Sequence, residues 1–130
     1  MRLIREFMAA LQLLLEGKDL EHRREELKKL YEQYIGPYEL YHNATIDVAM
    51  RALASYDEGQ RLERMEMLAE LYYAEADTVT GPDRNFLLDK AFNLFAFIER
   101  NGKTFSIDRR YKMGLIEQRL KKCSGKTRCE

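Results

Sequence analysis

The sequence predicts one all-α domain of five to six helices, packed as stacked antiparallel hairpins or as a compact helical bundle. Apolar residues recur with helical spacing along nearly the whole chain, while no stretch shows the polar–apolar alternation of a strand. β-Branched residues are few and scattered. The 130 residues suffice for one domain with its own core, and short connectors leave no room for a second. We assign 1–122 to this domain and 123–130 to a flexible polar tail.

The first helix, within MRLIREFMAALQLLLEG, ends near Gly17. Its apolar residues occupy an arc of about 160° on a helical wheel, opposite Arg5, Gln12 and Glu16. This pattern is typical of a helix that docks on the rest of a domain. An in-plane membrane anchor is disfavoured because the polar face is mixed in charge, and a signal peptide is disfavoured because no small-residue cleavage site follows the short apolar run.

Capping and stop residues divide the rest of the chain into five further helices. Asp19 is the predicted N-cap of the second helix, and Asp83 is predicted to cap the fifth. Glycine closes several helices, with proline following it after the second. The predicted ranges are 19–35, 44–58, 61–77, 84–100 and 106–122.

The fourth and fifth predicted helices are apolar on more than one face. In the fifth, a broad stripe is centred on Phe92, while Phe86 and Phe97 lie together on a different flank. In the fourth, Met67 and Leu71 belong to a second stripe beside the main one. Such helices must contact neighbours on both sides, so we expect both in the middle of the stack. The second helix has one narrow apolar stripe and is expected outside.

One helical pair resembles a known repeat. LAELYY (68–73) looks like the first helix of a tetratricopeptide hairpin, and Ala91 with Phe95 resembles the alanine–aromatic pair of its second helix. The resemblance implies a tetratricopeptide-like array, although the connection between the two motifs is about ten residues longer than in that family. MRLIREF and NGKTFSIDRRYKM are similar to stretches of a family of small bacterial helical proteins of uncharacterised function, a resemblance that implies no site.

Charge is distributed unevenly. The chain has a formal net charge of zero, but 109–130 contains eight basic and two acidic residues. We favour the interpretation that this basic stretch offsets the acidic segment 57–77, within the chain or between copies. Nucleic-acid binding through the basic C-terminal helix is the alternative function. It is disfavoured because the basic residues spread around the helix and apolar residues give it packing contacts on two sides, namely Ile107, Tyr111 and Leu115, with Met113, Ile116 and Leu120.

The two histidines do not predict a metal site. DLEH and ELYH superficially resemble the Glu-x-x-His pairs of carboxylate-bridged di-iron bundles. However, His22 lies opposite the apolar stripe of its helix and is expected in solvent, and His42 is expected at a helix start. We predict no metal and no cofactor.

No other motif predicts an enzyme. GKT occurs at Gly102 and Gly125, but neither copy has the upstream glycine or the preceding strand of a phosphate-binding loop. Cys123 and Cys129 have the spacing of neither a redox pair nor a zinc site, and we interpret them as reduced thiols in a cytosolic tail.

The leading hypothesis is therefore a small cytoplasmic helical scaffold that binds another protein or a second copy of itself. No membrane span and no small-molecule substrate is expected, since no stretch reaches the roughly 18 apolar residues that a span requires. Surplus apolar surface motivates the hypothesis, because a domain of this size has too few helices to cover every apolar face. The candidate partner-binding residues are Leu11, Met67, Leu71, Phe86 and Phe97.

Overall fold

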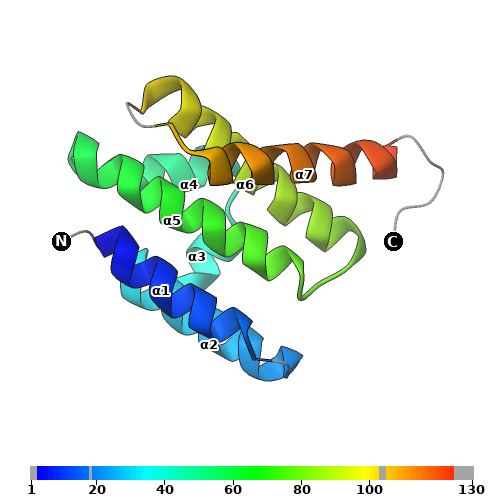
Figure 1. Ribbon diagram of the computed structural model, residues 1–130. Helices are drawn as coiled ribbons and strands as arrows, with labels where there is room; N and C mark the ends of the chain where they lie inside the picture. The colour runs from blue at the N-terminus through cyan, green and yellow to red at the C-terminus, as the bar shows by residue number, and fades with distance from the viewer. Residues whose placement is uncertain (1–2, 18, 103–104, 125–130) are drawn as a thin grey trace.

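Seven α-helices form the part of the chain that the computed structural model describes, residues 3–17, 19–102 and 105–124. No strand occurs within these ranges, so the predicted all-α fold class is confirmed. The predicted tail differs slightly, since Cys123 belongs to the last helix, whereas Cys129 lies outside the described residues. The helices are α1 (Leu3–Leu15), α2 (Leu20–Tyr34), α3 (Tyr38–Asn43), α4 (Ile46–Leu53), α5 (Glu58–Ala76), α6 (Gly81–Asn101) and α7 (Ile107–Ser124) (Figure 1).

The short helix α3 was not predicted. Its N-cap position is Pro37, which lacks a backbone N–H and has a backbone angle already suited to a helix start. The chain therefore becomes helical again directly after the Gly36-Pro37 stop instead of after Asn43. Thr45 then caps α4 by accepting a hydrogen bond from the Val48 N–H at 3.4 Å.

Two aspartates act as side-chain N-caps of their helices. Asp19 accepts from the Glu21 N–H at 3.1 Å, as predicted, and Asp57 accepts from the Gln60 N–H at 3.0 Å. The prediction that Asp83 caps its helix is wrong, because α6 begins two residues earlier at Gly81 and Asp83 lies in its first turn. Gly81 has a φ of +63°, which lets the chain enter α6 directly from the preceding turn.

Helices α5 and α6 form an antiparallel hairpin at the centre of the fold (Figure 1). α5 also packs against α1, α2 and α4, and α6 also packs against α4 and α7. The prediction that both helices contact neighbours on two sides is therefore confirmed. Their buried apolar side chains make up most of the core, and they include Met65, Met67, Leu68, Leu71 and Tyr72 of α5 and Leu87, Leu88, Ala91, Leu94, Phe95 and Ile98 of α6.

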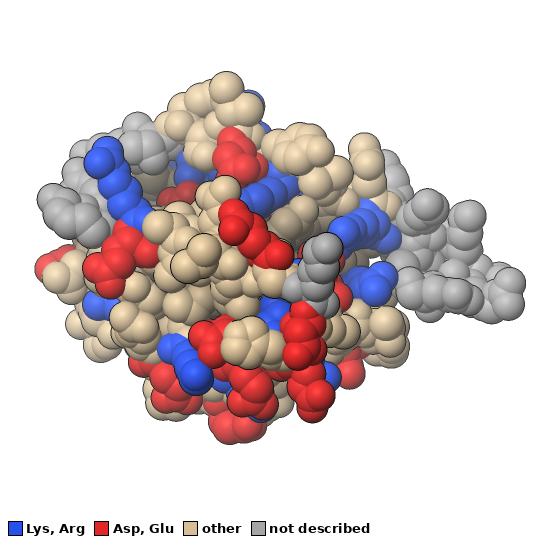
Figure 2. All heavy atoms as spheres, turned by 60° about the horizontal axis from the view of Figure 1, so that its bottom comes forward, with Lys and Arg blue, Asp and Glu red and all other residues tan. Residues whose placement is uncertain are grey.

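Helices α1 and α2 form a second hairpin that lies against α5 (Figure 1). α1 buries Phe7 and Leu11, as expected of a docked helix, and Glu63 of α5 accepts a hydrogen bond from the Ile4 N–H at 3.0 Å. The single apolar stripe of α2 is buried from Leu27 onward, which confirms its predicted outside position, although Leu20 is exposed. Charged side chains of both signs are scattered over the face that α1 and α2 present (Figure 2).

Candidate functional site

A buried carboxylate links three helices. Glu75 of α5 accepts hydrogen bonds from the hydroxyls of Tyr31 at 2.6 Å and Tyr38 at 2.5 Å, and His42 Nδ1 lies 2.9 Å from its Oε2. Burial, followed by the charge of Glu75, raises the pKa of Tyr31 well above its usual value. These residues come from α2, α3 and α5, so the contacts hold the short α3 in place. His42 is in the last turn of α3, and the expectation of a helix start is wrong.

Lys90 of α6 is a buried cation beside this carboxylate cluster. Its ammonium donates to the backbone carbonyls of Tyr41, His42 and Ala44 at 2.8–3.2 Å, where α3 ends and favours positive charge. The Nζ atom also lies 4.3 Å from the centre of the Tyr72 ring. Burial lowers the pKa of Lys90 to about 8, although Glu75 acts to raise it. Because these polar groups are partnered with one another, the cluster is a structural link between helices.

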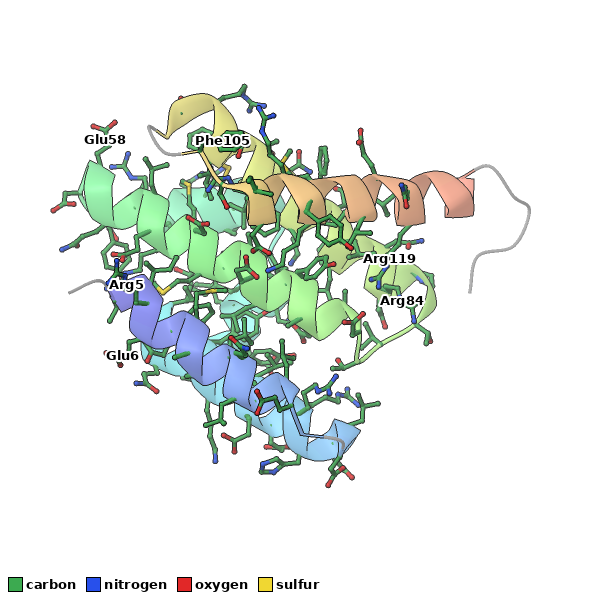
Figure 3. The ribbon with its side chains drawn as sticks, in the orientation of Figure 1. Arg5, Glu6, Glu58, Arg84, Phe105 and Arg119 are labelled. Carbon is green, nitrogen blue, oxygen red and sulfur yellow. The ribbon has the colours of Figure 1, made fainter. Side chains whose placement is uncertain are left out.

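The inner side of α7 is joined to α5 and α6 by ion pairs. Arg109 is buried between Glu99 at 2.6 Å and Glu66 at 3.3 Å. Two similar pairs follow along the helices, Lys112–Glu70 at 2.6 Å and Arg119–Asp77 at 3.4 Å. Figure 3 shows Arg119 on the side of α7 that faces the turn between α5 and α6. The predicted offset of acidic 57–77 by the basic stretch is confirmed within one chain.

These ion pairs shift the pKa values of their members. Hydrogen bonds from Arg109 lower the pKa of Glu99, against the effect of burial. Burial raises the pKa of Glu70, although Lys112 acts to lower it. Burial also acts to lower the pKa of Lys112, but attraction to Glu70 and Asp108 outweighs it and the pKa is raised. Four basic residues of α7 are engaged by carboxylates, since Arg110 also pairs with Glu99 at 3.1 Å, which counts against the alternative of nucleic-acid binding.

The outer side of α7 carries apolar side chains that none of the described helices covers. Phe105, Ile107 and Tyr111 are exposed by 67%, 75% and 65%. Ile107 and Tyr111 are one helical turn apart and so share one face of α7, and Leu115 follows at its edge, partly buried. Figure 3 shows Phe105 at the turn that enters α7. The sequence predicted packing on two sides of this helix, but the chain itself covers only the side of Met113, Ile116 and Leu120.

A groove of about 410 Å³ runs over α5 between α1 and α7, and we call it the α5 trough. In Figure 1, α5 lies between these two helices. The buried Lys112–Glu70 ion pair forms part of one side, while Asp77 and Asp108 are accessible to solvent. Its floor consists of Glu70, Tyr73, Ala74 and Asp77, and its walls consist of Met8, Leu11, Gln12 and Leu15 of α1 with Asp108 and Lys112 of α7.

The structure does not bring the five predicted partner-binding residues together. Leu11, Met67 and Leu71 are buried, so the interpretation that they lie on uncovered surface is wrong, because α5 is enclosed by helices on several sides. Phe86 is 42% exposed, and the centre of its ring lies 4.2 Å from Lys90 Nζ. Phe97 is partly buried against the core, three helical turns from Phe86.

Of the five, only Leu11 lines the α5 trough. Sequence reasoning missed the trough because its floor combines charged and apolar residues of α5, which do not form an apolar stripe. The sequence did contain one feature that could have indicated the α1 wall of the trough. The spacing of Met8, Leu11, Gln12 and Leu15 places these residues on one side of α1.

The described residues contain no group of three or more His, Cys, Asp or Glu side chains that could hold a metal ion. Within the same residues, no helix is long and apolar enough to cross a bilayer. Comparison with known proteins finds no matching family model, no similar curated protein and no similar solved structure. The resemblances to tetratricopeptide hairpins and to small bacterial helical proteins stay predictions.

Proposed function

We propose that this protein is a small helical interaction module that binds an amphipathic, basic helical segment of a partner protein in the α5 trough. The observation that carries the proposal is the shape of the trough, which is apolar along α1 and bordered by accessible carboxylates. Helix-in-groove binding uses a preformed apolar groove of this kind, into which the partner places residues at i, i+3, i+4 and i+7.

The α1 wall and the floor of the trough have the same residue spacing. Positions 8, 11, 12 and 15 of α1 follow the pattern i, i+3, i+4, i+7, and so do positions 70, 73 and 74 of α5 with its C-cap residue Asp77. Each row therefore covers two helical turns, about 10 Å along its axis. A third helix laid between the two rows would meet side chains at its own helical period, which favours a helical occupant over an extended one.

Charge favours a basic occupant. The lining contains three carboxylates, Glu70, Asp77 and Asp108, but only one cationic group, the ammonium of Lys112. Glu70 is buried and engaged by Lys112, whereas Asp77 and Asp108 have side chains that are 48% and 63% exposed. Their present ion pairs are surface pairs of small stability, so lysine or arginine of a partner can replace them at little cost.

The test measures binding of a labelled synthetic amphipathic helix of leucine and lysine by fluorescence anisotropy. We expect saturable binding to the wild type, and at least tenfold weaker binding to Leu15→Arg. That substitution removes a leucine contact worth about 1.5–3 kcal/mol and adds a charge of the same sign as the peptide. Asp108→Asn should also weaken binding, and more so at low than at high salt.

Leu13→Arg provides the matched control, because Leu13 is on the same helix, is 72% exposed and does not line the trough. It should bind the peptide as the wild type does. A second control peptide has glutamate in place of lysine and should bind far more weakly. The proposal is wrong if the two peptides bind equally, or if Leu15→Arg and Leu13→Arg have the same effect.

A further inference from the structure

The uncovered outer face of α7 has a glycine in its middle that the fold of one chain does not require. Glycine destabilises a helix interior relative to alanine. A Cβ atom added at Gly114 would meet no atom within 4 Å, so no neighbour in the described structure demands the small residue. Gly114 lies between Ile107, Tyr111 and Gln118 on the outer face, one turn beyond Tyr111. The missing side chain leaves open space on this face, into which a group from outside the chain can approach closely.

Two side chains of opposite charge along one edge of this face would be self-complementary in an antiparallel pair of helices. Arg110 and Glu117 lie along one edge of the outer face, two helical turns apart. The midpoint of this pair lies between residues 113 and 114. A two-fold axis at this point would place Arg110 opposite Glu117 of a second copy, and this contact would occur twice in the interface.

We propose that two copies of this chain associate through α7, antiparallel, about a two-fold axis beside Gly114. The Tyr111 ring of each copy then packs over Gly114 of the other, where the missing side chain leaves space. Ile107 and Leu115 lose their contact with water in the same interface. Arg110 is held at the edge of the apolar face by an ion pair with Glu99 of its own chain at 3.1 Å and by the Phe105 ring, whose centre lies 4.9 Å from the guanidinium carbon. This interface is separate from the α5 trough and does not depend on its function.

Exchanging the charges of residues 110 and 117 tests the proposed antiparallel pairing. The molecular mass in solution is measured by analytical ultracentrifugation over a wide range of protein concentration. We expect a dimer that is weakened at least tenfold by Arg110→Glu and by Glu117→Arg, because each variant places like charges opposite each other twice. The double variant should recover at least most of the lost affinity, since the two charges have exchanged places across the interface. A parallel pairing or another interface gives no such recovery.

The variant Gly114→Gln tests dimerisation without destabilising the fold of the single chain. Its side chain points into open space in one chain and is a better helix former than glycine, so the monomer should be at least as stable as the wild type. Dimerisation should nevertheless be lost, because two glutamines cannot fit at the crossing. A wild type that stays monomeric at all concentrations would overturn the proposal. So would a dimer that is unaffected by Gly114→Gln, or single charge variants whose defect the double variant fails to repair.

Discussion

Replacing Glu75 with leucine should remove a large part of the stability of the fold. The substitution preserves approximate size but deletes the acceptor of the Tyr31 and Tyr38 hydroxyls, and it removes the carboxylate near the buried Lys90 ammonium. Tyr38 keeps a partner, since its hydroxyl lies 3.1 Å from His42 Nδ1. Tyr31 is fully buried and has no alternative acceptor among its described contacts.

The expected loss in the free energy of unfolding is about 3–5 kcal/mol, the range for breaking a buried charged set by removing one member. About 1–3 kcal/mol of this is the cost of leaving the Tyr31 hydroxyl without a partner. Glu75→Gln should cost only about 1–2 kcal/mol, because the amide oxygen still accepts one of the two tyrosine bonds. The free energy of unfolding of a domain of this kind is about 5–15 kcal/mol in total, so the Glu75→Leu variant should be close to unfolding.

Urea unfolding at neutral pH, followed by far-ultraviolet circular dichroism, measures these differences. Glu25→Leu is the control, since Glu25 is an exposed residue of α2 and its replacement should change stability by no more than about 0.5 kcal/mol. A loss below about 1 kcal/mol for Glu75→Leu, or one equal to that of the control, would refute the reasoning that this carboxylate links the helices.

Two further predictions concern pH and backbone conformation. Burial lowers the pKa of Lys90 to about 8, so between about pH 8 and 10 the unfolded chain binds more protons than the folded one and stability should rise with pH. Above about pH 10 stability should fall, because burial and Glu6 raise the pKa of Tyr34 to about 12 and the unfolded tyrosine ionises first. A urea midpoint that decreases steadily from pH 8, with no difference between the wild type and Lys90→Met, would contradict this. Gly81→Ala should cost about 1–2 kcal/mol because of its positive φ, whereas Gly59→Ala in the first turn of α5 should add about 0.5–1 kcal/mol. Thermal unfolding of the two glycine variants measures these effects, and equal shifts of the melting temperature would contradict the reasoning from the positive φ of Gly81.

Helices were predictable where the signal is local. Asp19 and the Gly36-Pro37 stop act within a few residues, so the start and end of α2 could be read from the chain. The six-residue α3 contains less than two turns, which is too short to display an apolar period. The predicted apolar stripe centred on Phe92 buries Phe95 and Ile98, because its width alone requires burial, while Phe92 itself is partly buried.

Contacts between distant segments could not be predicted in the same way. Met67 and Leu71 were assigned to free surface because nothing near them in sequence shows that α1, α2, α4 and α6 enclose α5. Nothing in the sequence distinguishes Lys90 from a surface lysine, because the three carbonyl groups that accept its hydrogen bonds lie 46–49 residues earlier in the chain. Tyr31 and Glu75 are separated by 44 residues. The same holds for the α5 trough, whose lining comes from three helices.

Methyl nuclear magnetic resonance of the methionines, during titration with the leucine–lysine peptide, tests the proposed binding in the α5 trough most directly. Met8 lines the trough, whereas Met50 belongs to α4 and is not among the lining residues. The account predicts a saturable shift of the Met8 methyl signal, with the Met50 signal unchanged and little response to the leucine–glutamate peptide. An unchanged Met8 signal, or equal shifts of both methyl groups, would contradict it.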